Sequence, residues 1–406
     1  MSEITPVVVA AQRTPFGKEG GVFADVRPED LSVAVIDKLL AETGLTGEAV
    51  DDLMWGCAQQ RAEQGNNMAR IITLLSALGE SVPGTTINRW CASSAQAIMS
   101  AADAIRAGQR SCIGAGGVES MSAVEMGFNS NIHPRLTEEY NLAALQMGMT
   151  AEEVADRYDV SREAQDDYAY RSHERAAEAA TSGRFGREIV PVDTAAGPVE
   201  HDEGIRHDID REKLASLPTV FVSDGSVTPG NASQITDGAA GMVLCSEAFA
   251  RDRGLEILAA IGNHSVAGVE PEVMRIGPIP ACEQLLERSE TTMADYGLVE
   301  LNEAFASQCL YCQRELDIPE DRYNVNGGAI AIGHPLGATG ARLPVTLVHE
   351  MHEQGVDRGL ATECVGFGQG AAIELPRQVW PRGWGRSRVV PAAARRSGWL
   401  VERRRP

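Results

Sequence analysis

The 406-residue chain is too long for one simple core, and its 43% hydrophobic and 23% charged content is that of an ordinary soluble globular protein. No apolar run is long enough to span a bilayer, and a formal net charge of −21 repels nucleic acid and anionic membranes. Eight cysteines without a signal-peptide pattern predict reduced thiols and a cytoplasmic protein, so we expect neither a membrane nor a nucleic-acid partner.

The basic residues are almost all arginine. Only three of the 36 are lysines, namely Lys18, Lys38 and Lys213. An acidic, lysine-poor surface suits a high-salt cytoplasm, where screening relieves self-repulsion, and this predicts a halophilic protein. An acidic protein encoded by a GC-rich genome is the alternative.

The C-terminal tail differs in composition from the rest. Residues 377–406 contain nine arginines, one acid and three of the five tryptophans, which gives +8 against −29 for residues 1–376. Such a tail is either a basic arm for an anionic partner or sequence that does not belong to the fold. We favour the second interpretation and expect a peripheral or poorly ordered segment.

Hydrophobic periodicity predicts alternating strands and helices in the first 120 residues. A strand from residue 6 precedes a helix over 28–43, a strand over 50–56 and a helix over 67–77. An extended segment over 85–90 then leads into a helix that starts near Cys91, and a strand begins at 111. This order is typical of an α/β layered domain.

Residues from about 120 to 245 lose this alternation and predict an inserted excursion. It contains one helix from Thr150, with a capping box, and a second from its N-cap Ser161. The alternation resumes with helices over 280–288, 303–315 and 340–354 and strands over 296–301, 359–364 and 371–375. The two stretches indicate two similar halves, although the sequence repeat is weak.

Cys91 lies at a strand-to-helix junction beside small residues. The periodicity places it on the first turn of a helix, whose free N–H groups and dipole favour an anionic thiolate. A nucleophilic cysteine is one interpretation. A buried cysteine that acts as a small hydrophobe is the other.

Three further junctions could complete such a site. Asn302 ends a strand, His334 lies in a glycine-rich loop, and Cys364 ends a strand before alternate glycines that include Gly366. His334 can serve as the base that a nucleophilic cysteine needs, and the Gly366 region can offer N–H groups to an oxyanion. The glycine runs could also be simple turns or a phosphate cradle, but neither nucleotide-binding glycine pattern is present.

Other cysteines and histidines do not predict a metal. Cys309 and Cys312 form a single C-x-x-C pair on a predicted helix, which favours core packing. His349 and His352 have the wrong spacing for a zinc-binding helix. We expect no metal site.

Nine segments together resemble the thiolase family, over residues 5–376. They are Arg13-Thr-Pro-Phe-Gly, Asn88-Arg-Trp-Cys91-Ala-Ser-Ser, Gly116-Gly-Val-Glu-Ser-Met-Ser, Met147-Gly-Met-Thr-Ala-Glu, Gly230-Asn-Ala-Ser-Gln-Ile-Thr-Asp-Gly-Ala-Ala, Gly277-Pro-Ile-Pro-Ala, Asn302-Glu-Ala-Phe-Ala, Gly333-His-Pro-Leu-Gly-Ala-Thr-Gly and Cys364-Val-Gly-Phe-Gly-Gln-Gly.

The resemblance implies an α/β thiolase fold of two βαβαβαββ halves in five layers with an inserted loop domain. The N-terminal half would cover residues 1–262, with the loop domain over about 120–245, and the C-terminal half 263–376. Residues 377–406 would lie outside it. The resemblance also implies a homodimer or a homotetramer.

The resemblance implies a role for each motif residue. Cys91 matches the acylated nucleophile, His334 its base and Cys364 the second acid/base. Asn302 matches the residue that holds an oxyanion-stabilising water with His334, and the backbone N–H groups of Cys91 and Gly366 match the second oxyanion hole. Positions that bind coenzyme A or substrate are matched by Met147, Asn263, Met274, Ala304 and Phe305.

The implied reaction is the cleavage of 3-ketoacyl-CoA by coenzyme A, which is a substrate, without any metal or redox cofactor. An acetoacetyl-CoA thiolase that condenses two acetyl-CoA molecules is the alternative, and a non-catalytic acyl-CoA carrier or scaffold is a third. Gln146, where acetoacetyl-CoA thiolases usually have His, favours the first. Further departures from the family pattern are Ala92, Arg275 and Phe367, and they leave the chain-length preference open.

Overall fold

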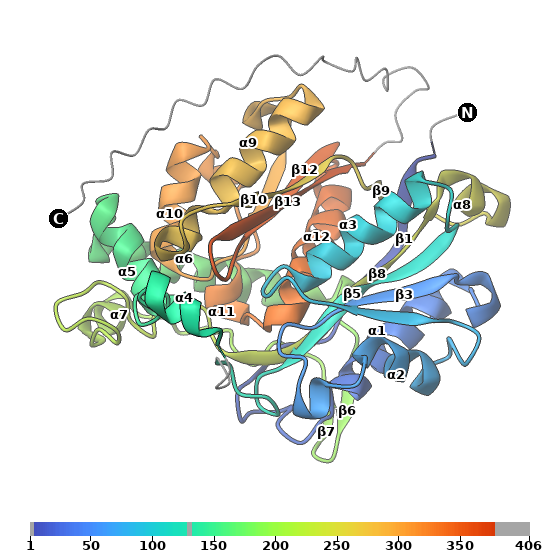
Figure 1. Cartoon of the computed structure of the whole chain (residues 1–406), viewed down its shortest axis with the longest axis horizontal. Coiled ribbons are helices and arrows are strands. Elements are labelled where there is room, and N and C mark those ends of the chain that lie inside the picture. Colours follow the sequence, from blue (N-terminus) through green and yellow to red (C-terminus); the bar gives the residue numbers. More distant parts are fainter. Residues whose placement is uncertain (1–3, 128–131, 378–406) are drawn as a thin grey trace.

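Two mixed β-sheets form the framework of the computed structural model, which describes residues 4–127 and 132–377 (Figure 1). The N-terminal sheet has the order β4-β3-β5-β8-β1-β9, with β2 paired to β8. Its strands are β1 (Pro6–Arg13), β2 (Gly17–Lys18), β3 (Asp52–Gly56), β4 (Gly84–Ile87), β5 (Cys112–Ser120), β8 (Thr236–Ser246) and β9 (Ala259–Ala260). β3 runs parallel to β4 and β5, whereas β8 runs antiparallel to both β5 and β1.

The C-terminal sheet has four strands in the order β10-β13-β12-β11. They are β10 (His264–Gly268), β11 (Leu298–Leu301), β12 (Arg358–Val365) and β13 (Gln369–Pro376). Where the N-terminal half has a further parallel strand, this half has only an isolated parallel bridge between Val299 and Tyr323. Both halves therefore combine a mixed sheet with flanking helices, but the N-terminal sheet has seven strands and the C-terminal sheet four.

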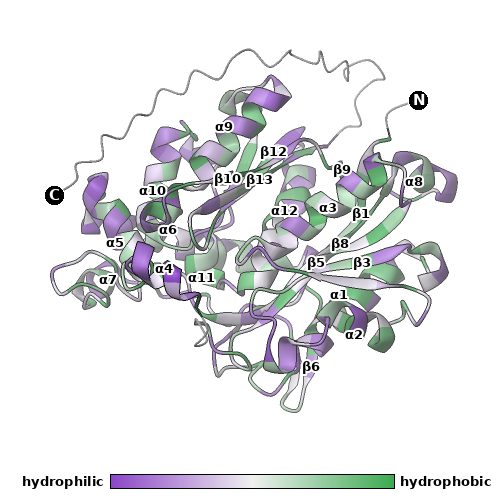
Figure 2. Ribbon diagram, viewed as in Figure 1, coloured by the Kyte–Doolittle hydropathy of each residue, from purple (hydrophilic) through white to green (hydrophobic). Residues whose placement is uncertain are grey.

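Six helices complete a five-layer arrangement. α1 (Pro28–Thr43) and α2 (Met68–Leu75) pack on the outer face of the N-terminal sheet. α3 (Ser93–Arg106) and α12 (Leu336–Gln354) lie between the two sheets, and α9 (Pro278–Ser289) and α10 (Ala306–Glu315) cover the outer face of the C-terminal sheet (Figure 1). Apolar residues concentrate on α1, β1 and β8, whereas the outer helix α9 carries hydrophilic residues (Figure 2).

The two central helices contact each other near their N-terminal ends. The backbone N–H of Ala341 in α12 donates to Ser94 Oγ in α3 at 2.8 Å. A Cβ on Gly340 would lie 2.5 Å from the backbone nitrogen of Ala95, so only glycine permits this approach. Because Cys91 precedes α3 and His334 precedes α12, this contact brings both residues to one end of the central layer.

The excursion between β5 and β8 contains most of the remaining elements. They are α4 (Pro134–Glu139), α5 (Met147–Arg157), α6 (Arg162–Thr181), β6 (Val192–Thr194), β7 (Gly197–Val199) and α7 (Arg211–Ser216). The excursion ends at Thr236, not near residue 245, because β8 already pairs with β2 at Thr236 and with β5 from Asp237. Ser161 caps α6 as expected, but α5 begins at Met147, and Thr150 bonds back to the Met147 carbonyl instead of forming a capping box.

The short elements outside the layers are α8 (Glu247–Arg253), α11 (Ala329–Ile332) and six 3₁₀ turns: η1 (Gly47–Ala49), η2 (Ala62–Gln64), η3 (Arg184–Arg187), η4 (Pro271–Ile276), η5 (Met293–Asp295) and η6 (Glu320–Arg322). No helix in the described ranges has both the length and the apolarity needed to cross a membrane. The expectation for the basic tail falls on residues 378–406, which lie outside the described residues.

Candidate active site

Cys91 sits between β4 and α3, two residues before the first helical residue Ser93. It is 4% exposed and packs in an apolar cluster with Leu336, two residues beyond His334. Burial raises the pKa of the Cys91 thiol to about 12, with further increases from Cys364 and Glu363, against Arg275 and the backbone N–H of Gly366, which lower it. The expected thiolate stabilisation by the helix terminus therefore does not prevail over desolvation, and Cys91 is a neutral thiol that needs a base.

The hydrogen bonds of Thr339 favour one tautomer of His334. The Thr339 hydroxyl donates its only proton to the Pro335 carbonyl at 2.9 Å, and Thr339 Oγ1 lies 2.6 Å from His334 Nδ1. Nδ1 then carries the proton that Thr339 Oγ1 accepts, and Nε2 of the neutral ring is the hydrogen-bond acceptor. Nε2 faces Asn302, whose Nδ2 lies 3.3 Å away.

The environment keeps His334 neutral. Burial lowers its pKa to about 3, and the positive charges of Arg275 and Arg342 act in the same direction. Asn302 Oδ1 is buried without a hydrogen-bond partner, although the Asn302 side chain touches the imidazole. The pair thus offers a proton acceptor and an amide donor at the same point.

Cys364 lies near the C-terminal end of β12 and is 1% exposed. Its thiol donates to Gln308 Oε1 at 3.7 Å, and Arg275 Nη1 donates to its sulfur at 3.4 Å. Gln308 Nε2 in turn donates to the carbonyl of Asn302 at 3.0 Å. Gln308 therefore joins the second cysteine to the strand end that carries Asn302.

Four of the five candidate substrate-binding residues lie on elements around this centre. Met147, Ala304 and Phe305 belong to the same apolar cluster as Cys364. Met274 is buried in η4, immediately before Arg275. The structure does not bring Asn263 there, because its side chain donates to Ser289 Oγ. Asn263 precedes the first residue of β10, whereas the other end of this strand, at Gly268, pairs with Gln369 near the candidate site.

Two residues that hold the site together, Thr339 and Glu119, are not among those predicted from the sequence. Thr339, which fixes the His334 tautomer, lies in the quoted histidine motif. Glu119 lies in the quoted Gly116 motif, and its carboxylate accepts the backbone N–H groups of Ala58 at 2.9 Å, Gln59 at 3.0 Å and Gly337 at 2.8 Å. Glu119 thereby fixes the first turn of α12 at Gly337, three residues after His334.

Ser233 is closer to the site than Asn263. Its N–H donates to the carbonyl of Ala304 at 3.0 Å, and the preceding Ala232 forms a bridge with Phe305. Its position in the quoted Gly230-Asn-Ala-Ser motif was a signal that sequence reasoning could have used.

Cys309 and Cys312 are buried in the core that α10 shares with the C-terminal sheet. Their thiols point to backbone carbonyls, that of Asn302 at 3.9 Å and that of Arg275 at 3.6 Å. Within residues 4–127 and 132–377, no group of three or more His, Cys, Asp and Glu side chains is arranged to hold a metal ion.

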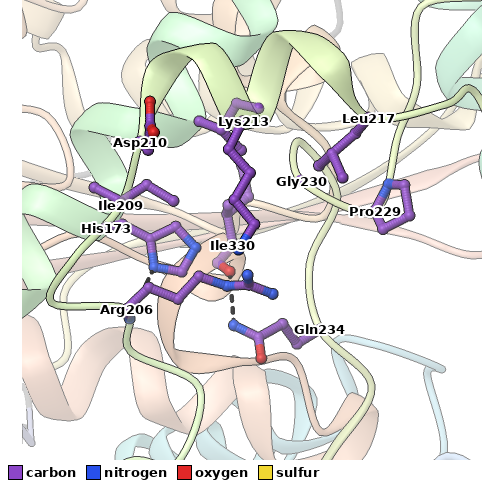
Figure 3. Close-up of a pocket in the computed structure, with 11 residues that line it drawn as sticks. His173, Arg206, Ile209, Asp210, Lys213, Leu217, Pro229, Gly230, Gln234 and Ile330 are labelled. Carbon is purple, nitrogen blue, oxygen red and sulfur yellow. Dashed lines mark hydrogen bonds between the residues drawn. The ribbon is translucent and has the colours of Figure 1, made fainter.

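A separate pocket lies where α7 and the neighbouring loops of the excursion meet Ile330 (Figure 3). Lys213 extends into it from α7, toward His173 and Arg206, and Gln234 lines its far wall. The carbonyl of Gln234 accepts the backbone N–H of His334 at 3.0 Å. Gln234 therefore connects the wall of the pocket to the loop of His334, but none of the candidate catalytic side chains lines the pocket.

Two family models match the chain consecutively. The thiolase N-terminal domain matches residues 6–248 and the thiolase C-terminal domain residues 255–377. Together they cover nearly all the described residues, and the chain belongs to the thiolase family.

Relatives and solved structures agree with this assignment. A 3-ketoacyl-CoA thiolase of Pseudoalteromonas translucida is 45% identical over 92% of this chain and 98% of its own length. The human mitochondrial 3-ketoacyl-CoA thiolase superimposes with a TM-score of 0.86 at 36% identity, over 92% of this chain and 99% of that chain. An acetyl-CoA acetyltransferase of Bacillus anthracis gives 0.85 at 38% identity, over 93% and 100%. The expected thiolase fold is confirmed.

Proposed function

We propose that this chain is an acyltransferase that cleaves 3-ketoacyl-CoA with coenzyme A, giving acetyl-CoA and a shortened acyl-CoA, in fatty-acid β-oxidation. The observation that carries this proposal is that Cys91, His334, Cys364 and Asn302 lie at one end of the central helices, where the backbone N–H of Gly366 acts to lower the pKa of Cys91. The full-length relatives named 3-ketoacyl-CoA thiolase support the substrate class.

In the proposed first half, His334 Nε2 takes the proton of Cys91, and the sulfur attacks the 3-keto carbon. The N–H groups of Cys91 and Gly366 stabilise the resulting oxyanion. The bond between C2 and C3 then breaks, its electron pair forms the enolate of acetyl-CoA, and Cys364 protonates C2. Asn302 and His334 support the enolate oxygen, through a water as the resemblance implies.

In the second half, the thiol of coenzyme A gives its proton to the Cys364 thiolate and its sulfur attacks the acyl carbon on Cys91. The bond between this carbon and the Cys91 sulfur then breaks, and the released Cys91 thiolate takes back the proton that His334 holds. Every proton and electron pair is then accounted for by these side chains and the two thioesters, so we propose coenzyme A as a substrate and no cofactor.

We further propose a self-associating cytoplasmic protein. β4 is an edge strand of the N-terminal sheet, and Leu74 and Leu75 on the adjacent α2 are 49% and 57% exposed. An uncovered strand edge beside exposed leucines favours pairing with a second copy, as a homodimer or a homotetramer. Eight free cysteines suit a reducing compartment. Light scattering on the full chain, with a Leu74→Lys, Leu75→Lys variant as comparison, tests the association.

Thiolysis of 3-ketoacyl-CoA substrates of increasing chain length tests the activity directly. We expect turnover on medium and long chains to exceed that on acetoacetyl-CoA, and the reverse order would favour the condensing enzyme. Cys91→Ser should abolish turnover, whereas Cys364→Ala should still form the acyl-enzyme, detected by mass spectrometry, but should block exchange of the acetyl α-protons. Normal turnover in Cys91→Ser would refute the mechanism.

A further inference from the structure

Arg275 places a positive charge inside the candidate site. It is 2% exposed, and its guanidinium donates to Cys364 Sγ at 3.4 Å, to the Met147 carbonyl at 2.8 Å and to Thr150 Oγ1 at 3.1 Å. Its Cζ also lies 4.4 Å from the centre of the Phe305 ring. These contacts come from α5, β12 and the start of α10, so the guanidinium is fixed from three sides.

All these partners of Arg275 are neutral groups. Only Cys364 can become negatively charged, by losing its thiol proton. In the described part of the chain no carboxylate lies within salt-bridge distance of Arg275, whereas the buried Arg13, Arg184 and Arg342 each have at least one. A buried cation without a counter-ion is costly, because desolvation removes the hydration that stabilises its charge. The Cys364 sulfur is the one contact that can supply a negative charge.

We propose that Arg275 stabilises the thiolate form of Cys364 and so helps this cysteine to release its proton to the leaving enolate. This inference rests on the proposed function. During cleavage the S–H bond of Cys364 breaks, a C–H bond forms at C2 of the acetyl unit, and the electron pair stays on sulfur. The guanidinium of Arg275 then faces the Cys364 thiolate. Its attraction to this anion is gained only once the proton has been transferred, so it favours the transfer.

Other titratable groups face Cys364 and must be considered. Burial raises the pKa of the Cys364 thiol, Arg275 lowers it by charge and hydrogen bond, and Glu363 raises it only at a pH where its own carboxyl is ionised. Cys91, Cys309 and Cys312 also interact with Cys364, and burial raises the pKa of each of these thiols. Arg275 is therefore the group whose removal should change the Cys364 proton affinity most.

Exchange of the acetyl-CoA methyl protons in D₂O, followed by NMR, measures proton transfer at Cys364. In Arg275→Met we expect exchange at neutral pH to fall about tenfold and the midpoint of its pH profile to rise by about one unit, since an opposite charge at this distance lowers a pKa by that amount or more. Acylation of Cys91, measured by mass spectrometry, should change much less. Arg275→Lys should restore most of the exchange.

Arg314→Met is the matched control, because Arg314 is exposed, lies over the Tyr311 ring and belongs to the neighbouring α10. If Arg275→Met does not fold, Arg275→Gln replaces it, since glutamine keeps hydrogen-bonding groups and loses only the charge. Unchanged exchange, or an equal fall of exchange and acylation, would overturn the role of Arg275. Absence of an acyl-enzyme in the wild type would instead refute the proposed function.

Discussion

Thr339 Oγ1 lies 2.6 Å from His334 Nδ1, and its hydroxyl donates a hydrogen bond to the Pro335 carbonyl, one helical turn earlier. The first turn of α12 thus decides which nitrogen of the catalytic candidate is a base. This relationship links a capping-type hydrogen bond to the chemistry of the site.

Replacement of Thr339 by valine should therefore slow acylation of Cys91. Valine keeps the shape but leaves Nδ1–H buried without an acceptor, which we expect to cost about 1–3 kcal/mol, or about tenfold or more in the acylation rate. Single-turnover acylation is the measurement. Thr339→Ser keeps the hydroxyl and should retain most of the rate, and equal losses in both variants would contradict the tautomer argument.

The acid side of the acylation profile should be flat. Because burial lowers the pKa of His334 to about 3, the base stays neutral from pH 8 down to about 5. A rate that falls with an apparent pKa between 6 and 7 would contradict this.

The same depressed pKa predicts a stability change with pH. In the unfolded chain the histidine binds a proton below about 6.5, while in the folded chain it does not until about 3. The folded state therefore loses stability as pH falls through this window, by up to about 1.4 kcal/mol per pH unit for this residue. Urea unfolding of wild type and His334→Asn at several pH values isolates that contribution.

Glu363 should be a site where substitution stabilises the protein. Both of its carboxyl oxygens are buried without a hydrogen-bond partner, and burial raises its pKa well above the usual range. The folded carboxyl stays protonated where the unfolded one ionises, so the wild type loses stability as pH rises above about 4.5. Glu363→Met should thus raise stability by about 1–3 kcal/mol at neutral pH, and more at higher pH. A destabilised Glu363→Met with no pH trend would disagree.

Glu119→Gln should affect both stability and activity. The glutamine amide would present an NH₂ group to backbone donors that now bond to a carboxylate, leaving at least one N–H unpaired. We expect a loss of about 1–3 kcal/mol and slower acylation, because α12 would no longer be fixed next to His334. Thermal unfolding and single-turnover acylation measure the two effects, and Glu125→Gln, an exposed change, is the control.

Molar KCl should stabilise the chain if its charge reflects a high-salt cytoplasm. The formal net charge of −21 creates self-repulsion that salt screens, since the Debye length falls to about 3 Å at 1 M. We expect the melting temperature to rise by about 5 °C or more between about 0.1 M and 2 M KCl. A flat response would remove the halophilic interpretation.

The candidate site could be located from the sequence because its residues lie in short motifs at strand and helix ends. Cys91, His334, Asn302 and Cys364 were found in this way. The proton affinity of Cys91 was not, because it depends on burial by segments that are distant in the chain. Glu119 shows the same limit, since its bond to Gly337 joins residues 218 positions apart.

The hydrophobic pattern of the sequence predicts that a helix is present better than it predicts where the helix starts. α1 ends and begins where the periodicity placed it, whereas α12 starts at Leu336, four residues before the predicted Gly340. Glycine and proline in that loop indicated a turn, and tertiary contacts with Glu119 and Ser94 made it helical.

The position of β8 has a consequence for how the chain folds. β8 joins the β4-β3-β5 group to β1, yet its residue Asp237 pairs with Ser120, 117 positions earlier. During synthesis, β5 therefore has an open edge until the whole excursion and β8 have been made. Such a late, long-range pairing makes sheet closure slow and leaves an apolar strand edge open to association, so losses to aggregation during refolding should increase with protein concentration.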